Sequence, residues 1–204
     1  MTFHCNVDAP RSPSFAPAPG SASLPPVLDA CCGGRMMWFD KSNPLALYMD
    51  KRRESLRWDD AGMSKLEVNP DVLADFTDMP FPDESFNLVV FDPPHMNSLG
   101  QNSKMAQLYG RLLPTWHCDI GEGFKECFRV LKPFGTLIFK WNECEIPLDE
   151  VVKLSPIPPL FGHATKRHGK THWLAFLKPN AGRNVRPASG RHVDALVMPG
   201  DCDR

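Results

Sequence analysis

The sequence predicts an α/β domain built on a mostly parallel sheet, and two observations support this. Short apolar runs typical of buried strands alternate along the chain with segments of helical periodicity. The last two of these runs are separated only by residues 162–170, which is too short for a crossover helix, so we expect those strands to pair antiparallel. A chain of 204 residues is long enough for one domain with its own core.

The individual elements follow from local pattern. A helix is expected over residues 116–131, where apolar side chains recur at steps of three and four and Pro133 and Gly135 follow as stop signals. A shorter helix is expected over residues 148–154, and we expect helices on both faces of the sheet. Runs rich in β-branched, aromatic and other apolar residues predict seven strands, at residues 26–30, 45–50, 72–75, 86–92, 135–141, 157–161 and 171–177.

The two ends of the chain differ in composition from its middle. Residues 1–24 are rich in Pro, Ala and Ser, and residues 179–204 form a basic tail, so we expect both to be flexible around a single domain at 25–178. No apolar run reaches the roughly 20 residues that a membrane span needs. Because the beginning of the chain also lacks the pattern of a signal peptide, we expect a cytoplasmic monomer or homodimer with no membrane partner.

Charge is distributed unevenly along the chain. The formal net charge of −1 shows that the chain as a whole is not a polycation. Basic residues nevertheless collect between 163 and 191 without any acid among them, and Lys166, Arg167 and Lys170 belong to this group. Such a patch is what phosphate binding needs, although a solvated basic tail explains the composition equally well.

The first three predicted strands carry an acid at or next to their carboxyl ends. The first runs into a glycine turn, in the segment VLDACCGG at 27–34, where glycine lets the backbone approach a ligand closely at the carboxyl edge of the sheet. Asp50 ends the second strand, where a carboxylate can hold ribose hydroxyls; a cap of the next turn is the alternative. Asp75 ends the third, and it can accept a hydrogen bond from an adenine amino group.

The most specific motif is the tetrad formed by Asp92, Pro93, Pro94 and His95, which begins at the last residue of the strongest predicted strand. The prolines fix φ and lack an N–H, so their carbonyls are free to accept hydrogen bonds. An aspartate and a proline carbonyl held side by side form a cradle of two acceptors for an NH2 group. The flat ring of His95 can stack on a planar substrate. The alternative is that the two prolines simply end a strand.

These motifs, in this order, resemble the class I S-adenosylmethionine-dependent methyltransferases. The resemblance is carried by LDACCGG, YMD, DFTDMPF, VVFDPPH and GFKECFRVLKPFGTLIFKW, and it spans residues 26–178. It implies a Rossmann-like fold with S-adenosyl-L-methionine in the cleft over strands one, two and four. The residues it assigns to the cofactor are Asp29, Ala30, Cys31, Cys32, Gly33, Gly34, Asp50, Asp75, Phe76 and Asp92.

Within that class, the tetrad is similar to that of amino methyltransferases acting on exocyclic nitrogens of adenine or cytosine, including small enzymes of phages and prophages. Aspartate in the first place looks more like the adenine-N6 type. Two departures are evident. His95 stands where that family usually has a larger aromatic residue, so stacking should be weaker, and the chain has no separate target-recognition domain.

The resulting hypothesis is that the chain methylates an exocyclic amino group of a nucleic-acid base. Adenine N6 in DNA is the favoured acceptor, and an RNA base is the alternative. Asp92 and the Pro93 carbonyl would accept the two amino hydrogens and so expose the nitrogen lone pair for attack on the sulfonium methyl. Residues 96–116 would form a lid or recognition loop, and Lys166, Arg167 and Lys170 would hold phosphates. The same cradle suits a protein amide or a small molecule, and a non-catalytic cofactor-binding module is a further possibility. We expect no metal ion.

Overall fold

The computed structural model describes residues 23–57, 65–100, 103–164 and 170–180. The two segments predicted to be flexible, 1–24 and 179–204, lie almost entirely outside these ranges. The basic residues Lys166 and Arg167 also lie outside them.

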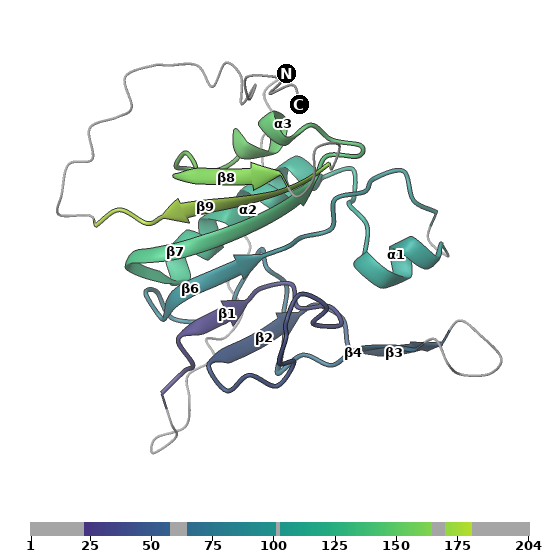
Figure 1. Cartoon of the computed structure of the whole chain (residues 1–204), viewed down its shortest axis with the longest axis horizontal. Coiled ribbons are helices and arrows are strands. Elements are labelled where there is room, and N and C mark those ends of the chain that lie inside the picture. Colours follow the sequence, from purple (N-terminus) through teal and green to yellow (C-terminus); the bar gives the residue numbers. More distant parts are fainter. Residues whose placement is uncertain (1–22, 58–64, 101–102, 165–169, 181–204) are drawn as a thin grey trace, which may run out of the picture.

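Seven strands form one sheet in the order β5-β2-β1-β6-β7-β9-β8 (Figure 1). Neighbouring strands are parallel throughout, except that β9 runs antiparallel to both β7 and β8. The predicted Rossmann-like sheet with an antiparallel last strand is therefore confirmed. The strands are β1 (Val27–Asp29), β2 (Ala46–Asp50), β5 (Val72–Leu73), β6 (Phe86–Phe91), β7 (Leu131–Asn142), β8 (Phe161–Ala164) and β9 (Thr171–Leu177).

The sixth strand of the sheet lies later in the chain than its sequence predicts. The expected strand at 157–161 was wrong, because β8 begins only at Phe161. Pro158 and Pro159 have no N–H to give to a ladder, so regular pairing with β9 starts after them. The antiparallel pairing of these last two strands is as predicted.

Two elements have no counterpart in the sequence-based prediction. A separate hairpin of β3 (Glu54–Arg57) and β4 (Lys65–Val68) stands between β2 and β5, where a crossover helix is usual. Leu66 and Val68 are buried at its base. The short helix α1 (Lys104–Tyr109) lies within the segment that we expected to be a loop. Both elements project beyond the carboxyl ends of the central strands (Figure 1).

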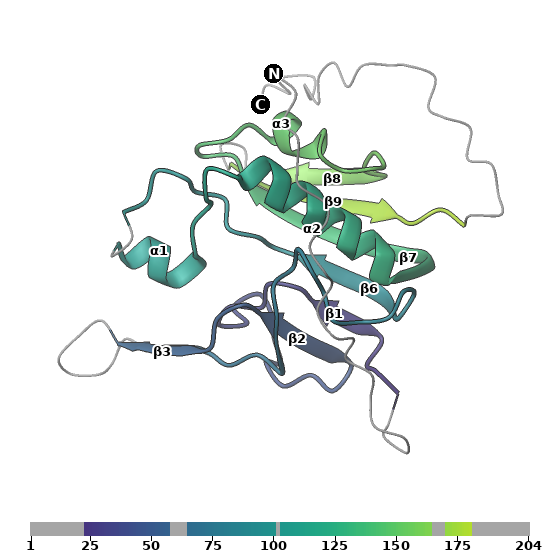
Figure 2. The same ribbon diagram turned by 180° about the vertical axis from the view of Figure 1, so that it is seen from behind.

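One face of the sheet is covered by the long helix α2 (Trp116–Val130), which confirms the helix predicted at 116–131 (Figure 2). Its fully buried side chains Ile120, Phe124 and Cys127 belong to the main core together with apolar residues of β6 and β7. The shorter helix α3 (Leu148–Val152) adds Val151 to the same core. The core therefore lies mainly between the sheet and these two helices.

The opposite face of β1 and β2 is covered by a loop. Between these strands, all of whose residues are described, the chain forms turns and bends rather than a helix. Trp38 of this loop packs edge-on against Tyr48 with ring centroids 5.1 Å apart. The Arg35 guanidinium lies 3.7 Å from the centre of the same tyrosine ring. Helices are therefore present, but they are distributed unevenly over the two faces.

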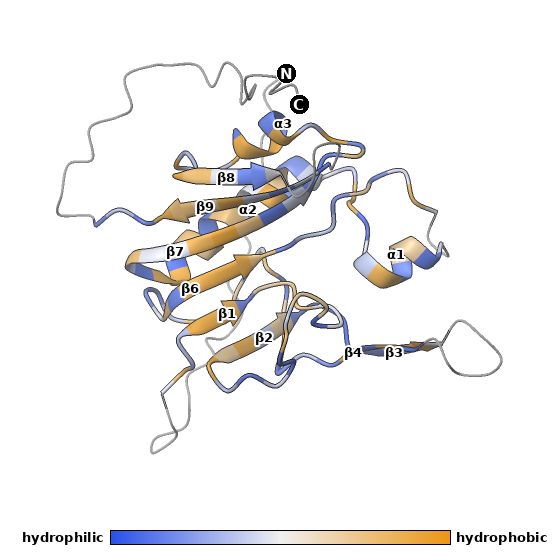
Figure 3. Cartoon of the chain, viewed as in Figure 1, coloured by the Kyte–Doolittle hydropathy of each residue, from blue (hydrophilic) through white to orange (hydrophobic). Residues whose placement is uncertain are grey.

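Hydropathy follows this arrangement. The central strands β1, β6 and β7 are mainly apolar, whereas the ends of β1 and β2 carry the acids Asp29 and Asp50 (Figure 3). Burial of the strands supplies the apolar contacts that hold the sheet, and the polar residues gather where the strands stop. Within the described ranges, no helix is long and apolar enough to cross a membrane.

Gly123 sets how closely α2 can approach the sheet. A Cβ atom at this position would lie 2.7 Å from Cζ of Phe91 and 2.8 Å from Cδ2 of Phe76, and both rings are buried. We therefore expect Gly123→Ala to lower the free energy of unfolding by about 1–3 kcal/mol, despite the helix propensity of alanine. Gly121→Ala on the same helix is the matched control, because its Cβ would meet nothing within 4 Å. Urea unfolding of both variants measures this, and equal midpoints would contradict the expected crowding.

Candidate active site

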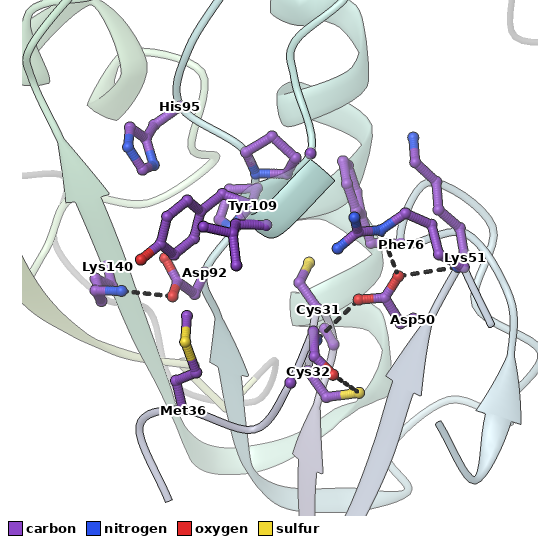
Figure 4. Close-up of a pocket in the computed structure, with 18 of the residues that line it drawn as sticks. Cys31, Cys32, Met36, Asp50, Lys51, Phe76, Asp92, His95, Tyr109 and Lys140 are labelled. Atoms are coloured by element: carbon purple, nitrogen blue, oxygen red, sulfur yellow. Dashed lines mark hydrogen bonds and ion pairs between the residues drawn. The ribbon is translucent and has the colours of Figure 1, made fainter. Parts of the chain in front are cut away.

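A pocket opens at the carboxyl ends of β1, β2 and β6 and is completed by β7 and α1 (Figure 4). This is where open α/β sheets bind their ligands, since the strand order reverses between β1 and β6. Most residues that the sequence assigned to a site meet here. The lining comprises Ala30, Cys31, Cys32, Gly33, Gly34, Met36, Met37, Asp50, Lys51, Arg52, Phe76, Asp92, Pro93, Pro94, His95, Leu108, Tyr109, Gly110, Arg111 and Lys140.

The first part of the pocket couples the glycine turn to the acid of β2. Gly33 has a φ of 48°, a conformation that glycine adopts without strain, and its N–H donates to Oδ2 of Asp50 at 2.9 Å. The backbone N–H of Arg52 donates to the other oxygen at 2.9 Å. The same oxygen also accepts a hydrogen bond from Nε of Arg52 at 3.4 Å. Asp50 is therefore buried with a fixed orientation, and Oδ2 retains a lone pair for a ligand.

Asp29 and Asp75 lie outside the lining of this pocket. Asp29 is fully buried and accepts hydrogen bonds from Nε1 of Trp38 at 2.7 Å and from the Cys31 N–H at 3.3 Å. Asp75 accepts from the Thr77 N–H at 3.1 Å and from its hydroxyl at 3.0 Å. The structure thus gives both acids local partners. Phe76, the residue after Asp75, does line the pocket.

The buried carboxyl of Asp29 makes the stability of the fold depend on pH. Burial raises its pKa from 3.8 to about 7. The folded state then holds a proton that the unfolded state releases, so stability from this group is full below pH 3.8 and is lost as the pH rises through 7. Between pH 5 and 8 we expect a loss of up to about 3 kcal/mol in the native chain.

Asp29→Asn should flatten this dependence, because an amide can still accept from Trp38 but does not ionise. Urea unfolding at both pH values, in parallel on the native chain and the variant, isolates the contribution of this group. Parallel pH profiles for the two proteins would show that Asp29 titrates in the same range in the folded and unfolded states.

The tetrad forms the opposite part of the pocket. Oδ2 of Asp92 accepts a hydrogen bond from Nζ of Lys140, which lies 2.6 Å away on the neighbouring strand β7. Burial raises the pKa of Asp92, while the ammonium group of Lys140 acts in the opposite direction. Burial lowers the pKa of His95, which favours the neutral imidazole. The His95 ring packs nearly perpendicular to the buried Trp141, with centroids 6.2 Å apart.

Lys140 and Tyr109 were missed by the sequence-based prediction. Lys140 carries the one charge within the apolar run 136–141, and a lysine in a buried strand is a signal that could have been noticed. Tyr109 has no comparable signal, since its place in the pocket depends on α1. The segment 96–116, predicted as a lid or recognition loop, thus contributes a helix and four lining residues, Leu108, Tyr109, Gly110 and Arg111.

The two adjacent cysteines of the pocket are not prepared for nucleophilic attack. Burial raises the pKa of Cys31 well above its usual value and that of Cys32 to about 12. Both groups are therefore neutral thiols at pH 7, and a thiol is a poor nucleophile. Among the described residues, no group of three His, Cys, Asp or Glu side chains is arranged to hold a metal ion.

Of the three basic residues proposed for phosphate contacts, the structure describes only Lys170. It is exposed at the β7–β9 edge, where its carbonyl accepts from the Glu143 N–H at 2.8 Å. It does not line the pocket.

Comparison with known proteins gives similarity only at the level of solved structures. No family model and no curated protein matches the chain. An S-adenosylmethionine-dependent methyltransferase from Leishmania major is 17% identical with a TM-score of 0.46; the match covers 74% of this chain and 63% of that one. The N-methyltransferase NodS from Bradyrhizobium japonicum is 11% identical, with a TM-score of 0.47 and coverage of 79% and 89%.

A TehB-like S-adenosylmethionine-dependent methyltransferase from Corynebacterium glutamicum is 14% identical with a TM-score of 0.44, and the match covers 78% of this chain and 83% of that one. The fold of the chain is defined by its own sheet order, and its activity has to be argued from the pocket.

Proposed function

We propose that this chain is an S-adenosylmethionine-dependent N-methyltransferase that acts on an exocyclic amino group of a nucleic-acid base. The favoured acceptor is adenine N6 in DNA. One observation carries the proposal. The Asp92-Pro93 cradle and the Gly33–Asp50 cradle, which the sequence places far apart, line one pocket. A methyl transfer needs such a pair of neighbouring sites, one for the donor and one for the acceptor.

The residues of the first cradle fit the cofactor by their chemistry. Asp50 is a fixed, buried carboxyl group whose Oδ2 retains a lone pair, which suits a ribose hydroxyl. Gly33, where a Cβ would meet nothing within 4 Å, leaves the backbone accessible, and the Phe76 ring offers an apolar surface for a base. When bound, S-adenosylmethionine supplies the methyl group as part of an electrophilic sulfonium.

Asp92 and Pro93 act on the acceptor. The amino nitrogen of adenine is conjugated with its ring and is therefore a weak nucleophile. Lys140 occupies Oδ2 of Asp92, so Oδ1 is the oxygen that accepts one amino hydrogen, while the Pro93 carbonyl accepts the other. These two bonds turn the nitrogen lone pair out of conjugation. The raised pKa of Asp92 strengthens its carboxylate as the acceptor of the proton that the nitrogen loses on methylation.

The preference for a nucleic acid rests on a planar acceptor and on charge. His95, as a neutral ring beside the cradle, can stack on a base. Lys166, Arg167 and Lys170 belong to a stretch without acids, which suits a phosphate backbone. A base within a duplex would have to be flipped out to reach the pocket, at a cost of a few kcal/mol.

The direct test is transfer of labelled methyl from S-adenosylmethionine to DNA, RNA and bulk protein in parallel, followed by base analysis. Label in N6-methyladenine of DNA is the expected result. If label appeared only in RNA or protein, the assignment of the cofactor site would stand and the acceptor would belong to that class of molecule. Cofactor binding by calorimetry without any transfer would contradict a nucleic-acid acceptor and favour a small molecule or a non-catalytic module.

A further inference from the structure

We infer that Tyr109 of α1 is the second stacking surface of the acceptor site, holding the target base against His95. This inference rests on the proposed function, since it concerns the planar acceptor that function requires. His95 alone is a small ring in a position that calls for a strong stacking partner. Tyr109 supplies a larger aromatic surface from a different element of the fold.

Tyr109 lies on the same side of the pocket as the tetrad. Its ring centroid is 6.4 Å from that of His95, and the two ring planes are inclined by 46°. Both rings line the pocket with Asp92 and Lys140, and the Tyr109 ring projects towards this pair from α1 (Figure 4). Tyr109 remains 39% exposed, which leaves ring surface for a ligand.

The separation of the two rings is close to, but below, what a base between them needs. Stacked bases are spaced about 3.4 Å apart, so a base held between two rings needs them about 7 Å apart. The observed 6.4 Å is short of this by a few tenths of an ångström. To admit an adenine, the Tyr109 ring has to move outward and turn towards the plane of the His95 ring, from which it is inclined by 46°.

Three contacts set the position of α1 relative to the tetrad. Gly110, which ends the helix with a φ of 74°, packs so closely that a Cβ there would be 3.0 Å from Cγ of Pro94. The Leu112 N–H donates to the Met96 carbonyl at 2.7 Å. Nη1 of Arg52 donates to the Gln107 carbonyl at 2.9 Å. The helix that carries Tyr109 is thus docked on the ring of Pro94, on Met96 directly after the tetrad, and on Arg52 just beyond β2.

A second aromatic residue, Trp141, packs against His95 and sets its position. Trp141 is fully buried and packs against His95 nearly at right angles. The core therefore fixes the His95 ring, while α1 carries the Tyr109 ring. The two walls of the acceptor site therefore come from different parts of the fold, one from the core and one from a short surface helix.

The test compares ring substitutions at Tyr109 with a control on the same helix. The probe is an oligodeoxynucleotide carrying 2-aminopurine at the target position, with S-adenosylhomocysteine present, and methyl transfer is measured on the matching adenine oligonucleotide. Tyr109→Phe and Tyr109→Trp should retain fluorescence quenching and KM. Tyr109→Leu and Tyr109→Ala should lose quenching and raise KM about tenfold or more. Met105→Ala is the control, because Met105 is exposed on α1 and does not line the pocket.

The outcomes separate this inference from the proposed function. If the native chain methylates DNA and Tyr109→Leu keeps quenching and KM, the role of Tyr109 is wrong and the proposed function stands. If Met105→Ala has the same effect as Tyr109→Leu, the helix matters only as packing, and the inference fails. If the native chain neither quenches the probe nor methylates DNA, the proposed function fails, and the stacking role fails with it.

Discussion

Asp92→Ala is expected to reduce kcat for methyl transfer at least a hundredfold while cofactor affinity changes by less than about threefold. The substitution removes the oxygen that accepts an amino hydrogen, and losing one preorganised group of this kind costs about 10²–10³ in rate. Asp92 is held by Lys140 at 2.6 Å, so its carboxylate is already oriented before a substrate arrives. Transfer is measured with labelled cofactor, and binding is measured by calorimetry.

Lys140→Met is the control that separates orientation from acceptor chemistry. It leaves the Asp92 carboxyl in place but removes the cation that opposes the raising of its pKa by burial. The pKa of Asp92 should therefore rise further. Because activity requires the ionised form, the acidic limb of the pH profile of kcat/KM should move to higher pH in this variant. An Asp92→Ala enzyme with near-native kcat would overturn the acceptor role, whatever Lys140→Met does.

The strands of the sheet and the long helix were predictable because burial governs them. β6 and β9 are short, apolar and bounded by polar residues, and α2 has apolar residues at helical spacing. The convergence of Gly33, Asp50 and Asp92 followed from topology, because parallel strands bring their carboxyl ends to one edge of the sheet. A pattern repeated over many residues is what sequence reasoning detects well.

The hairpin and α1 were not predictable for the opposite reason. An isolated helix of six residues is unstable in water, so α1 exists only through tertiary contacts such as the bond between Arg52 and the Gln107 carbonyl. The hairpin is short and carries charged residues such as Lys65 and Glu67 on its exposed side. No local periodicity records such contacts between distant segments.

The sequence also could not tell which strand-end acids face a ligand. Asp29, Asp50 and Asp75 all lie at or just beyond the carboxyl ends of neighbouring strands, but only Asp50 of these three lines the pocket. Asp29 has Trp38 as its partner, nine residues along the chain. Whether a carboxylate turns to a loop or to a ligand depends on that loop's conformation, which the residue type alone does not specify.

Asp50→Ala is expected to weaken cofactor binding by about 10- to 100-fold, since one hydrogen bond to a charged carboxylate is worth roughly 1.5–3 kcal/mol. The change would also leave the Gly33 N–H, now 2.9 Å from Oδ2, without this acceptor and so loosen the glycine turn. Calorimetric titration with S-adenosylhomocysteine measures the affinity directly. Asp75→Ala is the matched control, a carboxylate following the adjacent strand that does not line the pocket, and it should change the affinity by less than about threefold.

The pair of variants locates the donor site. A loss at Asp50 alone would agree with a cofactor held by β1, β2 and the Phe76 ring. A comparable loss at Asp75 would mean that this side chain leaves Thr77 and turns to the ligand on binding, as the resemblance to methyltransferases implies for an adenine contact. Binding that survives both changes would place the cofactor elsewhere. The Asp92 carboxylate would then have no methyl donor beside it, and the proposed chemistry could not occur in this pocket.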